Sequence, residues 1–186
     1  MSTIIEDILA FNAKYSENYG STGDLSPIPA KETVILTCMD ARMDPAKLTG
    51  LVDGDAHIIR NAGGRASDDA IRSLIISHKL MGTDQWFVIH HTDCGMESIN
   101  DETMGRLLSE SLETAVLDKD TWKNIVRDGG TPIAKSIDWL TISNPRASVM
   151  EDVKKIREHP LVSRKVSVYG FIYNINTGKL EEVHGE

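Results

Sequence analysis

The chain is organised around Trp86-Phe87-Val88-Ile89-His90-His91-Thr92-Asp93-Cys94-Gly95, an apolar run that ends in histidine and is followed by a cysteine and a glycine. Apolar β-forming residues followed by polar turn residues indicate a buried strand that ends at the edge of a sheet. In open α/β sheets, ligands bind at that edge. His91 and Cys94 are both good ligands for Zn²⁺, and their spacing allows them to converge on one ion where the strand turns.

The other cysteine of the chain, Cys38, also ends an apolar run, Val34 to Thr37. Two neighbouring strands in register would place Cys38 beside His91 and Cys94. A structural zinc site is normally closed by four protein ligands, whereas a catalytic site keeps one position for water or substrate. Because the chain has no third cysteine, the sequence predicts a three-ligand zinc site of the catalytic kind.

Composition excludes several classes of protein. A formal net charge of −8 argues against a nucleic-acid-binding surface, which would be positive. Two cysteines in 186 residues do not make a secreted disulfide framework. The first residues carry Glu6 and Asp7 rather than the positive charge of a targeting peptide, and no apolar run approaches the roughly 20 residues that span a bilayer. We therefore expect a cytoplasmic protein with no membrane partner.

The order of the expected elements predicts an α/β fold. Apolar residues at helical spacing indicate a helix within 3–18, which would cover either its own sheet or a partner subunit. Strands are expected at 33–38, 55–60 and 86–91, with a short helix from Pro45 and a longer one between Ser67 and Gly82. Alternating strands and helices of these lengths indicate βαβ units, a parallel sheet and right-handed crossovers.

The second half of the chain gives a weaker pattern. Between Glu97 and Ser143 we expect three helices, around 104–112, 122–126 and 131–140. A further helix is expected to begin at Asn144 and Pro145 and to end before Pro160. A strand at 165–175, a turn and a strand at 179–183 predict a C-terminal hairpin. The sequence has no repeat and no linker, so we expect one domain, residues 1–186.

Asp40 and Arg42 follow Cys38 closely and are the candidate catalytic residues. Two thiolates would cancel the charge of the zinc ion, so a water bound to it would lose its proton less readily. A nearby side chain that assists this water would therefore be useful. Asp40 can accept a hydrogen bond from that water and orient it, and Arg42 can hold Asp40 ionised through a bidentate pair. If the pair opened, Asp40 could become a fourth metal ligand and block the site.

Three motifs resemble the successive signatures of the β-class carbonic anhydrases, a family that includes carbonyl sulfide and carbon disulfide hydrolases. They are Cys38-Met39-Asp40-Ala41-Arg42, Arg60-Asn61-Ala62-Gly63 and His91-Thr92-Asp93-Cys94-Gly95. The resemblance implies that Cys38, His91 and Cys94 bind zinc and that Asp40 and Arg42 form the catalytic pair. It also implies a central, mostly parallel sheet with flanking helices and a homodimer or homotetramer in which the N-terminal helix packs on a partner subunit. The chain is most similar to the short members, and the segment between Met96 and Asn144 departs from the common pattern.

The expected activity is attack of zinc-bound hydroxide on a small linear molecule whose carbon lies between two heteroatoms. Reversible hydration of CO₂ is the first hypothesis, because that activity is the more widespread in the family. Hydrolysis of carbonyl sulfide at the same site is the alternative, and a non-catalytic zinc-containing dimerisation module is a remoter one. A thiol redox protein would need a Cys-x-x-Cys pair, which this sequence lacks. A dinucleotide-binding enzyme would need Gly-x-Gly-x-x-Gly after the first strand, where this sequence has Cys38-Met39-Asp40 instead.

Overall fold

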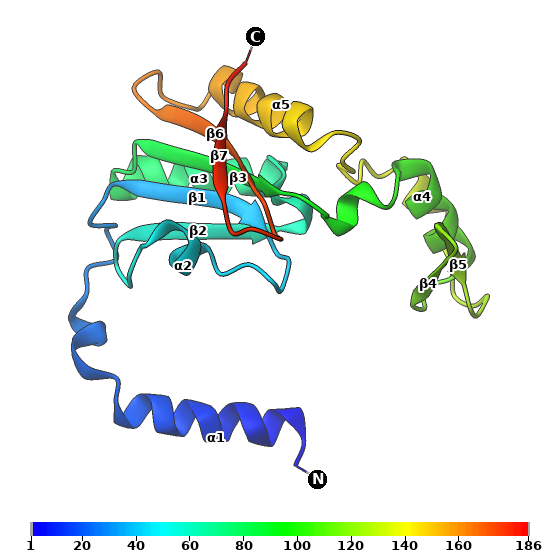
Figure 1. Cartoon of the computed structure of the whole chain (residues 1–186), viewed down its shortest axis with the longest axis horizontal. Helices are drawn as coiled ribbons and strands as arrows, with labels where there is room; N and C mark the ends of the chain where they lie inside the picture. Colours follow the sequence, from blue (N-terminus) through cyan, green and yellow to red (C-terminus); the bar gives the residue numbers. More distant parts are fainter. Residues whose placement is uncertain (1, 186) are drawn as a thin grey trace.

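The computed structural model describes residues 2–185 and is built on a five-stranded sheet in the order β2-β1-β3-β6-β7. The strands are β1 (Thr33–Cys38), β2 (Ala56–Asn61), β3 (Gln85–His91), β6 (Ser167–Tyr173) and β7 (Leu180–Val183). The first four run parallel, and β7 pairs antiparallel with β6 at the sheet edge. The predicted mostly parallel sheet with a C-terminal hairpin is confirmed (Figure 1).

Two helices cover one face of the sheet. These are α3 (Asp68–Met81) and α5 (Pro145–Glu158), whose apolar residues join alternate residues of the strands in one core. That core includes Leu36, Leu74, Trp86 and Val153. The Ser67 side chain caps α3 and Gly82 ends it in the left-handed conformation, as the sequence predicted. Alternation along the strands sends Ile35, Phe87 and Ile89 to the opposite face, where the short helix α2 (Pro45–Thr49) lies.

The N-terminal helix α1 (Ile4–Glu17) extends away from the sheet (Figure 1). Thr3 and Glu6 form a capping box at its start, which explains why the helix begins there. All of its residues are exposed, including Ile4, Ile8 and Phe11. Of the two expectations for this helix, the one in which it covers its own sheet is therefore wrong. No helix among residues 2–185 is long and apolar enough to cross a membrane.

The segment 97–143 projects from the body at the other side of the molecule (Figure 1). Its first predicted helix is present as α4 (Asp101–Glu110). The helix predicted around 122–126 is wrong, because β4 (Ala115–Asp118) and β5 (Thr121–Asn124) form an antiparallel hairpin there. The turn is made by Lys119 and Asp120, both with positive φ, and non-glycine residues in that conformation give little signal in a sequence.

The third predicted helix, 131–140, is also wrong apart from one 3-10 turn at Pro132–Ser136. The Asp101 carboxylate provides the reason, because it accepts hydrogen bonds from the Trp139 backbone N–H at 3.1 Å and from Thr141 Oγ1 at 2.7 Å. These bonds pull the chain back across the start of α4. Burial acts to raise the pKa of Asp101, but the hydrogen bonds from Thr141 and Trp139 outweigh it and leave the pKa lowered.

Replacing Asp101 with alanine is expected to lower the free energy of unfolding by about 1–3 kcal/mol at neutral pH, since it leaves Trp139 N–H and Thr141 without their acceptor. A lowered folded-state pKa gives stabilisation that is present above the unfolded-state pKa and is lost as the pH falls through the folded-state pKa. The difference between the two proteins should therefore shrink in acid, as urea denaturation at several pH values would show. The exposed Asp53, changed to alanine, is the control. A difference that stays constant down to pH ~3 would contradict this account.

Candidate metal centre

The carboxyl ends of two adjacent strands bring the predicted ligands together. β1 and β3 pair in parallel, with Thr37 opposite Ile89, so Cys38 and His91 end at the same edge of the sheet. Cys94 returns to that edge after a turn and starts the 3-10 helix Gly95–Glu97, where its backbone N–H donates to Glu97 Oε1 at 3.0 Å. The three ligand atoms all lie within 4.8 Å of one another, and the two sulfurs are 3.9 Å apart.

The donor atoms of this cluster suit a metal cation. His91 is buried, and its Nδ1 donates to the Thr92 carbonyl at 3.0 Å, which fixes the proton on that nitrogen. Its Nε2 therefore carries a lone pair, and this buried atom has no hydrogen-bond partner within residues 2–185. A backbone carbonyl that orients the histidine in this way is typical of metal ligands. Two sulfurs and one imidazole nitrogen are the donors that soft and borderline metals prefer.

The electrostatics of the cluster also favour a cation. The hydrogen bond from Cys94 lowers the pKa of the Cys38 thiol although burial raises it, and the same contact raises the pKa of Cys94. The two sulfurs, 3.9 Å apart, would repel each other if both were ionised. Burial lowers the pKa of His91, but the neighbouring Cys38 outweighs it and leaves that pKa raised. A positive ion between the three groups would allow both thiolates to form.

A glycine loop after β2 fixes the position of Cys38. Gly63 and Gly64 have φ of 78° and 70°, and a Cβ on Gly64 would lie 2.9 Å from the Cys38 backbone nitrogen. Only glycine permits this approach. Next to the loop lies a cavity of about 330 Å³, and its apolar wall includes Met39, Ala62 and Met96.

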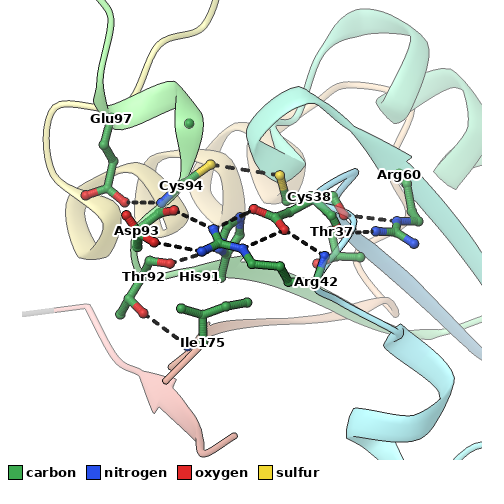
Figure 2. A network of polar contacts seen from close by, with 12 residues as sticks. Thr37, Cys38, Arg42, Arg60, His91, Thr92, Asp93, Cys94, Glu97 and Ile175 are labelled. Carbon is green, nitrogen blue, oxygen red and sulfur yellow. Dashed lines mark hydrogen bonds and ion pairs between the residues drawn. The ribbon is translucent and has the colours of Figure 1, made fainter. Parts of the chain in front are cut away.

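Asp40 is the charged residue in the wall of this cavity. Arg42 holds its carboxylate as a fork, with Nε donating to Oδ1 at 3.0 Å and Nη2 to Oδ2 at 2.7 Å. The hydrogen bond from the Arg42 side chain is the main reason why the pKa of Asp40 falls to about 2. Asp40 Oδ2 lies 3.8 Å from His91 Nε2, so this ionised oxygen faces the cluster. Figure 2 shows the three side chains of the cluster, Cys38, His91 and Cys94.

Two residues at this site stand in the quoted motifs, but the sequence predicted no role for them. Arg60 donates from Nε to the Cys38 carbonyl at 3.0 Å and from Nη2 to the Asp40 carbonyl at 2.7 Å. Asp93 accepts from Arg42 through both its carboxylate and its carbonyl. The signal for Arg60 was its place in the motif that ends the strand expected at 55–60, and in the structure it lies opposite Thr37, next to Cys38.

His90 points away from the cluster, as predicted, and is a hydrogen-bonded core residue. Its Nε2 lies 3.1 Å from Asp152 Oδ2, and Arg65 Nε donates to the same oxygen at 2.8 Å. All three side chains are buried. The two adjacent histidines therefore have separate roles: His91 lies at the cluster, and His90 makes a buried hydrogen bond that joins β3 to α5.

Known proteins resemble this chain over nearly its whole length. The family model for carbonic anhydrase matches residues 33–180. The β-carbonic anhydrase 1 of Mycobacterium tuberculosis is 37% identical over 183 residues, which cover 97% of this chain and 98% of the relative. A carbon disulfide hydrolase of Saccharolobus solfataricus is 32% identical over 187 residues, covering 97% of this chain and 91% of the relative. The segment 97–143 lies inside both matched lengths.

Solved structures agree with these matches. The carbonic anhydrase from Glaciozyma antarctica superposes with a TM-score of 0.83 at 37% identity, covering 99% of this chain and 100% of that chain. The resemblance of the three motifs to one family is confirmed by the sequence and structural matches together. The chain therefore belongs to the β-carbonic anhydrase family and is an enzyme of the zinc-dependent lyase and hydrolase type.

Proposed function

We propose that this enzyme reversibly hydrates CO₂ to bicarbonate, with zinc held by Cys38, His91 and Cys94 and with Asp40 and Arg42 as the catalytic pair. One observation supports this most directly. The ionised Asp40 is held in a fork by Arg42 and faces the Cys-His-Cys cluster, with its Oδ2 3.8 Å from His91 Nε2. A hydrogen-bond acceptor beside an open metal position is what the orientation of an attacking water requires.

Zinc bound there supplies Lewis acidity, which makes a water nucleophilic near neutral pH. The residues of the chain provide orientation. Because the pKa of Asp40 is about 2, its carboxylate is ionised at neutral pH and accepts a hydrogen bond from the attacking water. Arg60 fixes the backbone of Cys38 and Asp40 from behind, and the apolar wall admits a neutral linear molecule. The carbon of CO₂ is thus held beside a water that the Asp40 carboxylate orients.

Hydrolysis of carbonyl sulfide to CO₂ and sulfide is the second candidate. Two observations favour it, the 32% identity to a carbon disulfide hydrolase and the thioether side chains of Met39 and Met96 in the cavity wall. Thioethers are polarisable and pack well against sulfur. Turnover of one purified, zinc-loaded sample on CO₂ and on carbonyl sulfide, at matched substrate concentrations, decides between the two.

We also propose a homodimer or homotetramer in which α1 packs on a second copy. The apolar residues of α1 are exposed in the single chain, and full burial of such a side chain contributes about 1.5–3 kcal/mol. The sheet face opposite α3 and α5 offers an apolar hollow of about 410 Å³, whose lining includes Ile35, Phe87 and Phe171. A cytoplasmic location, also proposed, agrees with the two free cysteines, which must stay reduced to bind a metal.

Replacing Asp40 with alanine is expected to lower kcat for CO₂ hydration at least about a hundred-fold, the usual effect of losing a group that handles the proton of the attacking water. Stopped-flow measurement with a pH indicator would show this, together with zinc content to prove that the metal site is intact. Asp53→Ala is the control. Activity of Asp40→Ala equal to that of the unaltered enzyme, at full zinc content, would exclude Asp40 from the mechanism.

Chelation of the metal is expected to abolish activity, and added zinc to restore it, since the three donors lose the ion that activates water. The measurement is activity against bound zinc during stepwise reloading, which should rise in proportion. Cys94→Ser, in which one sulfur donor is lost, should need more free zinc for the same activity. Full activity in a sample with no bound metal would overturn the proposed chemistry.

An aspartate in place of Ile8 is expected to reduce the mass of the assembly in solution, because the charge would be buried against the second copy. Light scattering after size exclusion gives the mass. Ala10→Asp is the matched control, since it adds the same charge to the same helix two positions on and thus on the opposite face. Equal masses for the Ile8 variant and the unaltered protein would contradict this mode of assembly.

A further inference from the structure

The pair Asp40–Arg42 has a third member, Asp93. While Nε and Nη2 of Arg42 hold Asp40, Nη1 donates to Asp93 Oδ2 at 2.7 Å and Nη2 also donates to the Asp93 carbonyl at 2.8 Å. Figure 2 shows the Arg42 guanidinium beside Asp93. Two edges of the planar guanidinium are thus fixed. One is held by the Asp40 carboxylate and the other by Asp93, in the turn that leads to Cys94.

The backbone of Asp93 is shaped for this contact. It has a φ of 57°, in the left-handed region that residues other than glycine seldom adopt. In this conformation its carbonyl and its carboxylate both reach the same guanidinium. Asp93 lies in the turn between His91 and Cys94, so it connects Arg42 directly to the segment that carries two of the candidate metal ligands.

The exposure of these side chains argues against a mainly stabilising role. The Asp93 side chain is 73% exposed and that of Arg42 is 48% exposed, and exposed ion pairs contribute little to folding stability. The Asp40 side chain, in contrast, is only 15% exposed. Arg42 therefore reaches Asp40 from the solvent side, and without a second contact its long side chain would be free to swing outward.

The main chain of Asp40 is already fixed by Arg60, which donates to its carbonyl. The Arg42 backbone N–H also holds Asp40 Oδ1, at 2.9 Å. What remains to be fixed is Asp40 Oδ2, the oxygen nearer His91, and its direction depends on where the Arg42 guanidinium lies. We propose that Asp93 is a positioning residue that anchors this guanidinium, so that the Asp40 carboxylate stays directed into the cavity. The inference rests on the proposed function of the site and adds a residue to it.

The test uses the zinc-loaded, full-length enzyme with Asp93→Asn and Asp93→Gly. Asparagine keeps the size of the side chain and tolerates the left-handed backbone, whereas glycine removes the side chain and relieves the backbone. Both are expected to keep full zinc content and to lower kcat by about ten- to a hundred-fold with little change in KM, the effect of a misdirected catalytic group. Asp120→Asn, an aspartate with φ of 64° in the β4–β5 turn, is the matched control. Unchanged kcat in both Asp93 variants would overturn the proposal.

A double-mutant cycle distinguishes positioning through Arg42 from a general effect on the turn. In the background of Arg42→Lys, Asp93→Asn is expected to cause little further loss of kcat, because the group that Asp93 anchors has already been removed. Losses that multiply in the double variant would show that Asp93 acts independently of Arg42 and would overturn the proposal.

A second readout does not depend on turnover. Exchange of the Arg42 Nε–H proton with water, followed by NMR in metal-free and zinc-loaded protein, should be faster in Asp93→Asn than in the unaltered protein. If the unaltered enzyme turned over neither CO₂ nor carbonyl sulfide, the proposed function would fail, and the exchange rates would still test the anchoring of Arg42. Equal exchange rates in the two proteins would overturn it.

Discussion

Two buried sulfur atoms 3.9 Å apart, with an imidazole nitrogen beside them, are an arrangement that a protein can hold in its thiolate form only with a positive charge at the centre. The rest of the structure follows from this requirement. The sulfurs lie 56 residues apart in sequence, and they meet because β1 and β3 are adjacent, parallel and in register. Gly64 then allows the neighbouring loop to touch the backbone of Cys38. The sheet brings the ligand residues together, and the glycine loop packs against the backbone of one of them, Cys38.

Around this centre the charges are arranged in layers. The two cysteines and His91 lie innermost and buried, the Asp40 carboxylate lies at the cavity wall, and Arg42 and Arg60 hold Asp40 from outside. At this site two positive side chains, Arg42 and Arg60, thus orient a negative one. Such an arrangement suits a small neutral substrate, which needs orientation and a directed nucleophile more than electrostatic attraction.

The sequence predicted the sheet, and also that Cys38, His91 and Cys94 lie together, because both depend on local patterns. Apolar runs show the strands, and the first polar residue after each run shows which side chains meet at the edge. The prediction from sequence was wrong where the local structure depends on turn residues without a clear signal or on residues far apart in the sequence. The hairpin of β4 and β5 turns at two non-glycine residues, and the chain after the 3-10 turn is held by Asp101, about forty positions earlier. Asp93 was missed for the same reason, since its partner Arg42 is 51 residues away and no local pattern marks the pair.

The adjacent histidines at the end of β3 have a consequence for how the strand finds its alignment. β3 is apolar towards both sides of the sheet, with Trp86 and Val88 in one core and Phe87 and Ile89 in the other. A slip by one residue would exchange one apolar set for the other, so hydrophobicity alone opposes it only weakly. The polar end of the strand is what discriminates, since His90 has its acceptor on α5 and His91 its partners at the cluster. In a strand shifted by one residue, His90 would lose its hydrogen bond to Asp152 and His91 would leave the cluster, so these two polar residues specify the register of the central strand.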